Sequence, residues 1–114
     1  MIHLEGMYII RAVVIMQEKI ALKNSDATGY VIPAGPVNLV MVMAQHGMVG
    51  CGAFDVAALD NFGYPAARVK PSRGSSIASI EDLLAGEIKE SNQAAMKLGV
   101  KEGMSGKEAL DLLS

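Results

Sequence analysis

The chain has 114 residues, of which 51% are hydrophobic and 19% are charged, and its formal net charge at pH 7 is −2. This length fits one domain with its own core, residues 1–114, and so apolar a composition excludes intrinsic disorder. The small net charge, with three Tyr, two Phe and no Trp, argues against nucleic-acid binding, because neither a basic field nor a stacking platform is available.

The first 36 residues predict two strands followed by an irregular connection. Ile2–Leu4 is a short first strand, and the even positions from Tyr8 to Met16 are all apolar, which is the period-two pattern of a half-buried strand. Residues 17–36 contain a polar turn cluster and two prolines. We therefore expect a long hairpin connection or surface flap there, with Tyr30–Ile32 at most an edge strand.

Two strands are predicted in the middle of the chain. Val37–Gln45 is apolar on both faces, which is typical of a central strand covered on both faces by helices or by a second subunit. A turn at His46 and Gly47 leads into a short strand from Met48 to Cys51.

The second half predicts mainly helices. Apolar residues at helical spacing indicate a helix from about Phe54 to Phe62, and Ala66–Lys70 is a short strand candidate. Further helices are expected at about 80–85, with Ser79 as its N-cap, at about 88–98, and at 107–113, the last opened by a capping box at Ser105. The predicted fold is α+β, a mixed or antiparallel sheet from the N-terminal half packed with three to four short C-terminal helices.

The same patterns indicate a location and a state of association. The single cysteine forms no internal disulfide, and no apolar run approaches the roughly 20 residues that span a bilayer. We expect a cytoplasmic protein with no membrane partner. The apolar content exceeds that of an average domain, and burial between identical subunits explains it better than a large exposed apolar patch. We therefore also expect a homo-oligomer.

Two separated motifs carry a resemblance. Gln45 to Ala57 (QHGMVGCGAFDVA) and Leu98 to Leu110 (LGVKEGMSGKEAL) resemble the central and closing motifs of the YunC-like family. The resemblance covers about residues 37–114, while residues 17–36 are longer than the family pattern. It implies a small bacterial or archaeal α+β domain and no particular activity, because the family is one of unknown function.

The first candidate site is Gly50-Cys51-Gly52, at a predicted strand-to-helix turn. Unpaired N–H groups at a helix start hold anions and lower a thiol pKa, and glycines let a ligand approach the backbone. His46 is a candidate base and Asp55 could orient its imidazole. The structural alternative is a small buried thiol, with the glycines serving the turn and Asp55 stabilising the helix dipole.

The second candidate site is a basic loop that precedes a predicted helix. Arg68, Lys70 and Arg73, with Ser75 and its neighbouring serines, are suited to cradling a carboxylate or phosphate. The loop lacks the Gly-Lys-Ser/Thr ending of a phosphate-binding P-loop, so nucleotide binding is not indicated. The alternative is a solvated loop whose serines cap the helix.

We expect no metal and no cofactor. A site made of His46, Cys51 and Asp55, with or without His3, matches no familiar zinc spacing. The methionines, two of them in the predicted central strand, are interpreted as core residues.

Three functions remain open. The favoured one is a small-molecule binding or regulatory module that holds an anionic ligand near Gly50-Cys51-Gly52, because acid–base groups are too few for an obvious active site. The alternatives are an enzyme that uses Cys51 as its nucleophile and His46 as its base, and a purely structural oligomerising subunit.

Overall fold

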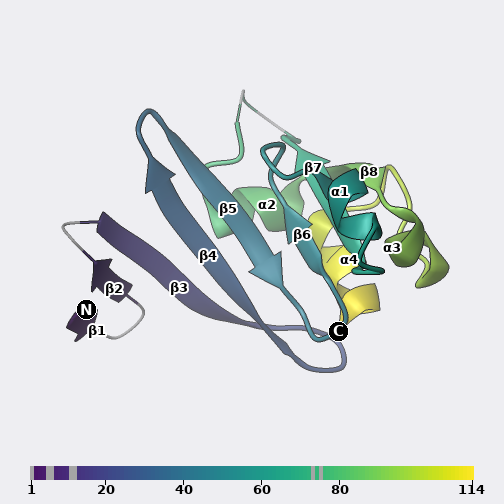
Figure 1. Cartoon of the computed structure of the whole chain (residues 1–114), viewed down its shortest axis with the longest axis horizontal. Coiled ribbons are helices and arrows are strands. Elements are labelled where there is room, and N and C mark those ends of the chain that lie inside the picture. Colours follow the sequence, from purple (N-terminus) through teal and green to yellow (C-terminus); the bar gives the residue numbers. More distant parts are fainter. Residues whose placement is uncertain (1, 5–6, 11–12, 73, 75) are drawn as a thin grey trace.

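One sheet with its strands in chain order forms the frame of the molecule (Figure 1). The computed structural model describes residues 2–4, 7–10, 13–72, 74 and 76–114, and within them it has eight strands and four helices. The strands are β1 (Ile2–Leu4), β2 (Met7–Ile10), β3 (Val13–Ala21), β4 (Asp26–Ala34), β5 (Val37–Met43), β6 (Met48–Gly50), β7 (Ala66–Lys70) and β8 (Glu87–Ser91). The helices are α1 (Val56–Asp60), α2 (Ile80–Ala85), α3 (Gln93–Lys97) and α4 (Gly106–Leu113).

The predicted α+β class is confirmed, and the sheet is mixed. Neighbouring strands are antiparallel except β6 and β7, which pair in parallel with Met48 opposite Ala66 and Gly50 opposite Arg68. Because parallel neighbours need a crossover connection, α1 lies between these two strands in the sequence.

Residues 17–36 belong to a hairpin, but the predicted long connection or flap and the edge position of Tyr30–Ile32 were wrong. The segment contains the second half of β3 and all of β4, which pairs with β3 on one side and β5 on the other, so Tyr30–Ile32 lies in an interior strand. The polar cluster is only a tight turn, closed by a 3.1 Å hydrogen bond from the Leu22 N–H to the Ser25 carbonyl. The predicted single strand from Tyr8 to Met16 is likewise two strands, β2 and β3.

The main core lies on one face of the sheet, under α2 and α4. Val40 and Val42 of β5 and Val49 of β6 are fully buried there, against Leu83 of α2 and Leu110 of α4. α1 covers the opposite face of β6 and β7 through a second, smaller cluster of Met48, Val56 and Ala66.

β5 is an interior strand, as predicted, and within the single chain only one of its faces is fully covered. Its alternate residues Leu39 and Met41 are half-buried on the side of α1, and the Met43 side chain is 42% exposed. α1 reaches β6 and β7, whereas the main core covers the other face of β5, so part of an apolar face faces solvent in the single chain.

The predicted helix 88–98 was wrong in its first half. Residues 87–91 form β8, which pairs with β7, and α3 begins only at Gln93 after the N-cap Asn92. The helix predicted from Phe54 is shorter as well, because α1 begins at Val56. α2 with its Ser79 cap and α4 with the capping box between Ser105 and Glu108 are confirmed.

None of the described helices is both long enough and apolar enough to cross a membrane.

Candidate functional site

The two predicted candidate segments meet at one edge of the sheet. Because β6 and β7 run parallel, Cys51 after β6 and Lys70 at the end of β7 lie at the same edge. β5 is antiparallel to β6, so its first residue, Val37, begins at that edge too. Ligands of sheets with parallel strands commonly bind outside the carboxyl ends of those strands.

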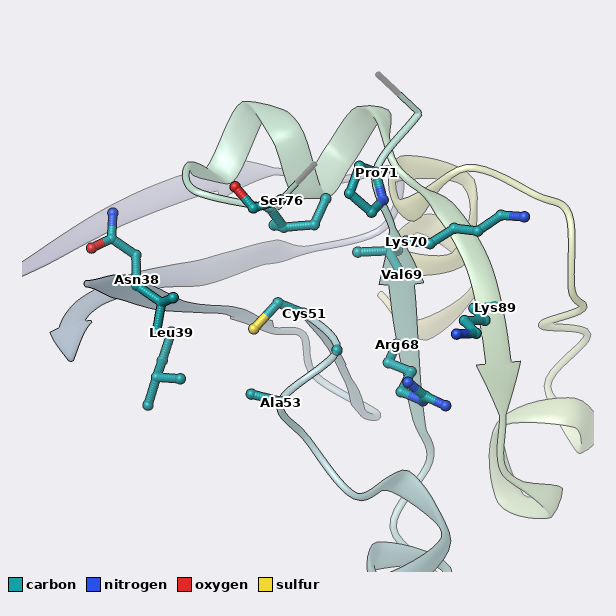
Figure 2. A pocket seen from close by; sticks show the side chains of 13 residues that line it. Asn38, Leu39, Cys51, Ala53, Arg68, Val69, Lys70, Pro71, Ser76 and Lys89 are labelled. Atoms are coloured by element: carbon teal, nitrogen blue, oxygen red, sulfur yellow. The ribbon is translucent and has the colours of Figure 1, made fainter. Parts of the chain in front are cut away.

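A groove of about 350 Å³ opens at this edge (Figure 2). Its walls come from the start of β5, the Cys51 turn, the end of β7, β8 and the loop before α2. Val37, Leu39, Ala53 and Ile77 supply apolar surface, and Ser76 is an exposed polar residue at its rim.

Cys51 lies in a tight turn and not at a helix mouth, which corrects the predicted anion site. Its N–H donates a 2.9 Å hydrogen bond to the Val40 carbonyl, so this donor is already satisfied. Residues 52–55 separate it from α1, whose N-terminus is capped by the Asp55 carboxylate accepting from the Ala58 N–H at 3.0 Å. The Cys51 side chain is buried, and Figure 2 shows its sulfur on the side of Leu39 and Ala53.

Three cations line the groove among the described residues. The Arg68 Nε lies 2.6 Å from the Glu90 Oε1. A Cβ atom added at Gly52 would lie 3.9 Å from the Arg68 Nη1, so the guanidinium lies beside the Cys51 turn. The Lys70 Nζ lies 3.0 Å from the Glu87 Oε2. The third cation is Lys89, which is exposed. Among the described residues that line the groove, none is acidic.

A β-bulge accounts for the position of Lys89. Arg68 pairs with Glu90 but Val69 pairs with Ile88, so Lys89 is one extra residue between them. A bulge changes the direction of a side chain relative to a regular strand. Here Lys89 lines the groove together with Arg68. Lys89 was missed from the sequence because a register shift depends on the partner strand. The alternation of charged and apolar residues at Glu87, Ile88 and Lys89 was the available signal for a strand.

His46 does not reach Cys51. It is exposed, precedes β6 while Cys51 follows it, and donates its N–H to the Leu113 carbonyl at 2.9 Å. Five residues of extended chain span about 16 Å, so β6 separates the two side chains. Asp55 is exposed and serves as the α1 cap.

The two glycines beside Cys51 differ in role. A Cβ at Gly50 would lie 2.5 Å from the Phe54 ring, so its missing side chain makes room for packing and not for a ligand. Gly52 lines the groove and has only Arg68 near it. The predicted ligand residues Arg73 and Ser75 lie outside the described residues.

In the part of the chain that the structure describes, no group of three His, Cys, Asp or Glu residues is placed to hold a metal ion.

Comparisons with known proteins confirm the predicted resemblance. The model of a family described as Domain of unknown function (DUF1805) matches residues 50–113. The chain is 33% identical to the uncharacterized protein YunC of Bacillus subtilis (strain 168) over 91 residues, which is 80% of this chain and 89% of that protein. The crystal structure of a protein of unknown function from Thermoplasma acidophilum matches 94% of this chain and 100% of its own, with a TM-score of 0.79 and 19% identity. That likeness concerns the fold alone. The family match spans Cys51, Arg68 and Lys89.

Proposed function

We propose that this chain, which belongs to the DUF1805 family, is a binding module for a small anionic molecule in the groove between the Cys51 turn and β7. The observation that carries the proposal is the charge of the groove. Arg68, Lys70 and Lys89 line it, and none of its described lining residues is acidic. Glu90 and Glu87, which pair with Arg68 and Lys70, are not among the residues that line the groove, so an anion that enters it is attracted by the three lining cations.

The contacts of Arg68 support this role. Glu90 engages the Nε atom, which restrains the guanidinium, and the Nη groups of an arginine remain suited to an anion's oxygens. The side chain of Arg68 is 26% exposed, so an anion bound there is partly screened from water and the interaction is stronger than on an open surface.

An enzyme with Cys51 as nucleophile is less well supported. His46, the candidate base, lies beyond the other end of β6, and Asp55 is occupied as a helix cap. A cytoplasmic location is also part of the proposal. Cys51 is a free, buried thiol, and free thiols are typical of reducing compartments such as the cytoplasm.

The test is ligand-dependent thermal stability of the full chain. Sodium phosphate and short carboxylates, each compared with sodium chloride at matched ionic strength, should raise the Tm, because a ligand that binds only the folded state stabilises it. Lys89→Ala and Arg68→Ala should lose most of this rise. Lys97→Ala, which removes an exposed lysine of α3, is the control and should keep it.

No rise with any anion, or an equal rise in the Lys89→Ala and Lys97→Ala variants, would overturn the proposal. The enzyme alternative is separated by the alkylation of Cys51 as a function of pH. A thiol that reacts only when the chain unfolds contradicts a nucleophile.

A further inference from the structure

We infer that the ligand is a monocarboxylate with a short apolar tail, its carboxylate between Arg68 and Lys89 and its tail directed toward the start of β5. The inference rests on the proposed function and adds the chemical class of the ligand and its orientation.

The two ends of the groove differ in character. The strands follow one another in the order β5, β6, β7, β8, so the groove crosses their ends in that order. Val37 and Leu39 of β5 form its apolar end, whereas Arg68 of β7 and Lys89 of β8 form its cationic end. In Figure 2, Leu39, Ala53 and the Cys51 sulfur lie on one side of the turn, and Arg68 and Lys89 lie on the other. Strands are spaced about 4.8 Å apart, so the tail has about 10 Å between β7 and β5.

The net charge favours one negative charge on the ligand. Glu90 pairs with Arg68 and Glu87 pairs with Lys70, so among the described residues three cations and two carboxylates leave one net positive charge at this end. A carboxylate neutralises this positive charge, whereas a doubly charged phosphate leaves one excess negative charge. The planar fork of an arginine also matches the two oxygens of a carboxylate.

The size of the groove limits the ligand. A volume of about 350 Å³ lies near the lower end of the roughly 300 to 1,000 Å³ found for small-molecule pockets. Val37 is 57% exposed, so a tail lying on it removes apolar surface of both partners from water.

The inference is tested with acetate, butanoate and hexanoate on the full chain, with 1-hexanol and inorganic phosphate as comparisons. Affinity should rise by about two- to fourfold for each added methylene, because burying a methylene group has roughly this effect. Hexanol should bind more weakly than hexanoate because it lacks the charge. Phosphate should also bind more weakly than hexanoate, because it lacks the apolar tail.

Two variants locate the tail. Ala53→Asp places a negative charge on an exposed residue of the groove and should weaken hexanoate binding at least tenfold. Ala57→Asp makes the same change on an exposed residue of α1 outside the groove lining and should leave it unchanged. Val37→Ser should flatten the dependence on tail length, because it removes apolar surface at the β5 end.

The thiol gives an independent readout. Cys51 is the one cysteine of the chain, and its sulfur lies on the side proposed for the tail. Saturating hexanoate should slow its alkylation, and saturating acetate should slow it less.

The outcomes separate the two proposals. Anions that bind through Lys89 with equal affinity at every tail length overturn this inference and leave the anion-binding function standing. Hexanol that binds as well as hexanoate, or no binding of any probe, overturns both.

Discussion

Asn92 connects four segments through one buried amide. Its Oδ1 accepts from the Ala66 N–H at 3.1 Å and from the Ala95 N–H at 2.9 Å, and its Nδ2 donates to the Val56 and Tyr64 carbonyls at 3.0 and 2.9 Å. The side chain thereby caps α3 and fixes both ends of the α1 crossover to the start of β7. All of its polar atoms are satisfied, so we assign it to the scaffold that positions the groove.

Asn92→Ala should lower the free energy of unfolding by about 3 kcal/mol, because it removes a helix cap and leaves buried N–H and carbonyl groups unpaired. Urea denaturation measures the change. Asn38→Ala is the matched control, since that exposed amide makes one hydrogen bond to the Ala78 carbonyl, and its cost should stay below about 1 kcal/mol. Equal effects of the two changes would contradict the assigned role.

The two glycines of the Cys51 turn should respond differently to substitution. Gly50→Ala should cost about 1 to 3 kcal/mol, because the added methyl group overlaps the Phe54 ring. Gly52→Ala should leave stability nearly unchanged, since the nearest atom to a Cβ there is Arg68 Nη1 at 3.9 Å. The comparison is made by thermal unfolding of both variants, and a larger loss at Gly52 would show that the assignment is reversed.

At the residue scale, the sequence predicted what depends on near neighbours. The Ser79 and Ser105 caps were recognised because each bonds to a backbone N–H three residues onward. The contribution of Lys89 to the groove and the bonds of Asn92 to residues up to 36 positions away have no local pattern, so neither was predicted.

At the scale of elements, strand β4 shows why local composition misled. Gly29 lies in its interior because the Ile80 and Ile20 side chains occupy the space, and a Cβ would be 2.6 Å from the Ile80 Cδ1 atom. In the sequence, that glycine and Pro33 indicated a flap. The helix α2 that accounts for the glycine is about 50 residues further along the chain, so the strand could be identified only from its partners.

A second element-scale feature joins α4 to the β3–β4 turn. The Lys23 N–H donates to the Asp111 Oδ1 at 2.9 Å, and the Asn24 N–H donates to the Ser114 Oγ at 3.1 Å. The Lys107 ammonium lies 2.8 Å from both Asp111 oxygens. The hydrogen bond from the Lys107 side chain, with a smaller contribution from the Lys23 N–H, holds the pKa of Asp111 below its ordinary value of 3.8.

This pKa shift predicts a pH dependence of stability. A carboxyl whose pKa is lower in the folded chain stabilises it at pH values above the ordinary pKa, and the contribution is lost as the pH falls below 3.8 toward the folded value. Asp111→Asn should therefore cost about 1 kcal/mol at neutral pH and less in acid, in denaturation series at several pH values. Glu102→Gln, at an exposed position, is the control. A cost of Asp111→Asn that does not change with pH would contradict the mechanism.

At the scale of the whole molecule, the half-covered sheet bears on association. Leu39, Met41 and Met43 share the face of β5 that lies outside the main core. Such a face is energetically unfavourable in water, and a second copy of the chain is the occupant that the apolar composition led us to expect.

Association predicts a mass above that of one chain in sedimentation equilibrium. Met43→Lys should reduce that mass without unfolding the chain, because it places a charge on the exposed part of the face. Met96→Lys, on the exposed surface of α3, should not change it. A wild-type protein that sediments as a single chain would contradict the expected homo-oligomer.

The order of the strands also has a consequence for synthesis on the ribosome. Each described strand lies beside the one made just before it, so the sheet can grow at its newest edge as the chain emerges. The helices that cover the main core are encoded later, α2 at 80–85 and α4 at 106–113. More than 60 residues must therefore be translated after β5 before α4 can cover the apolar face of β3 to β5. This interval, and not strand pairing, is the stage at which a nascent chain is most exposed to aggregation and to capture by chaperones.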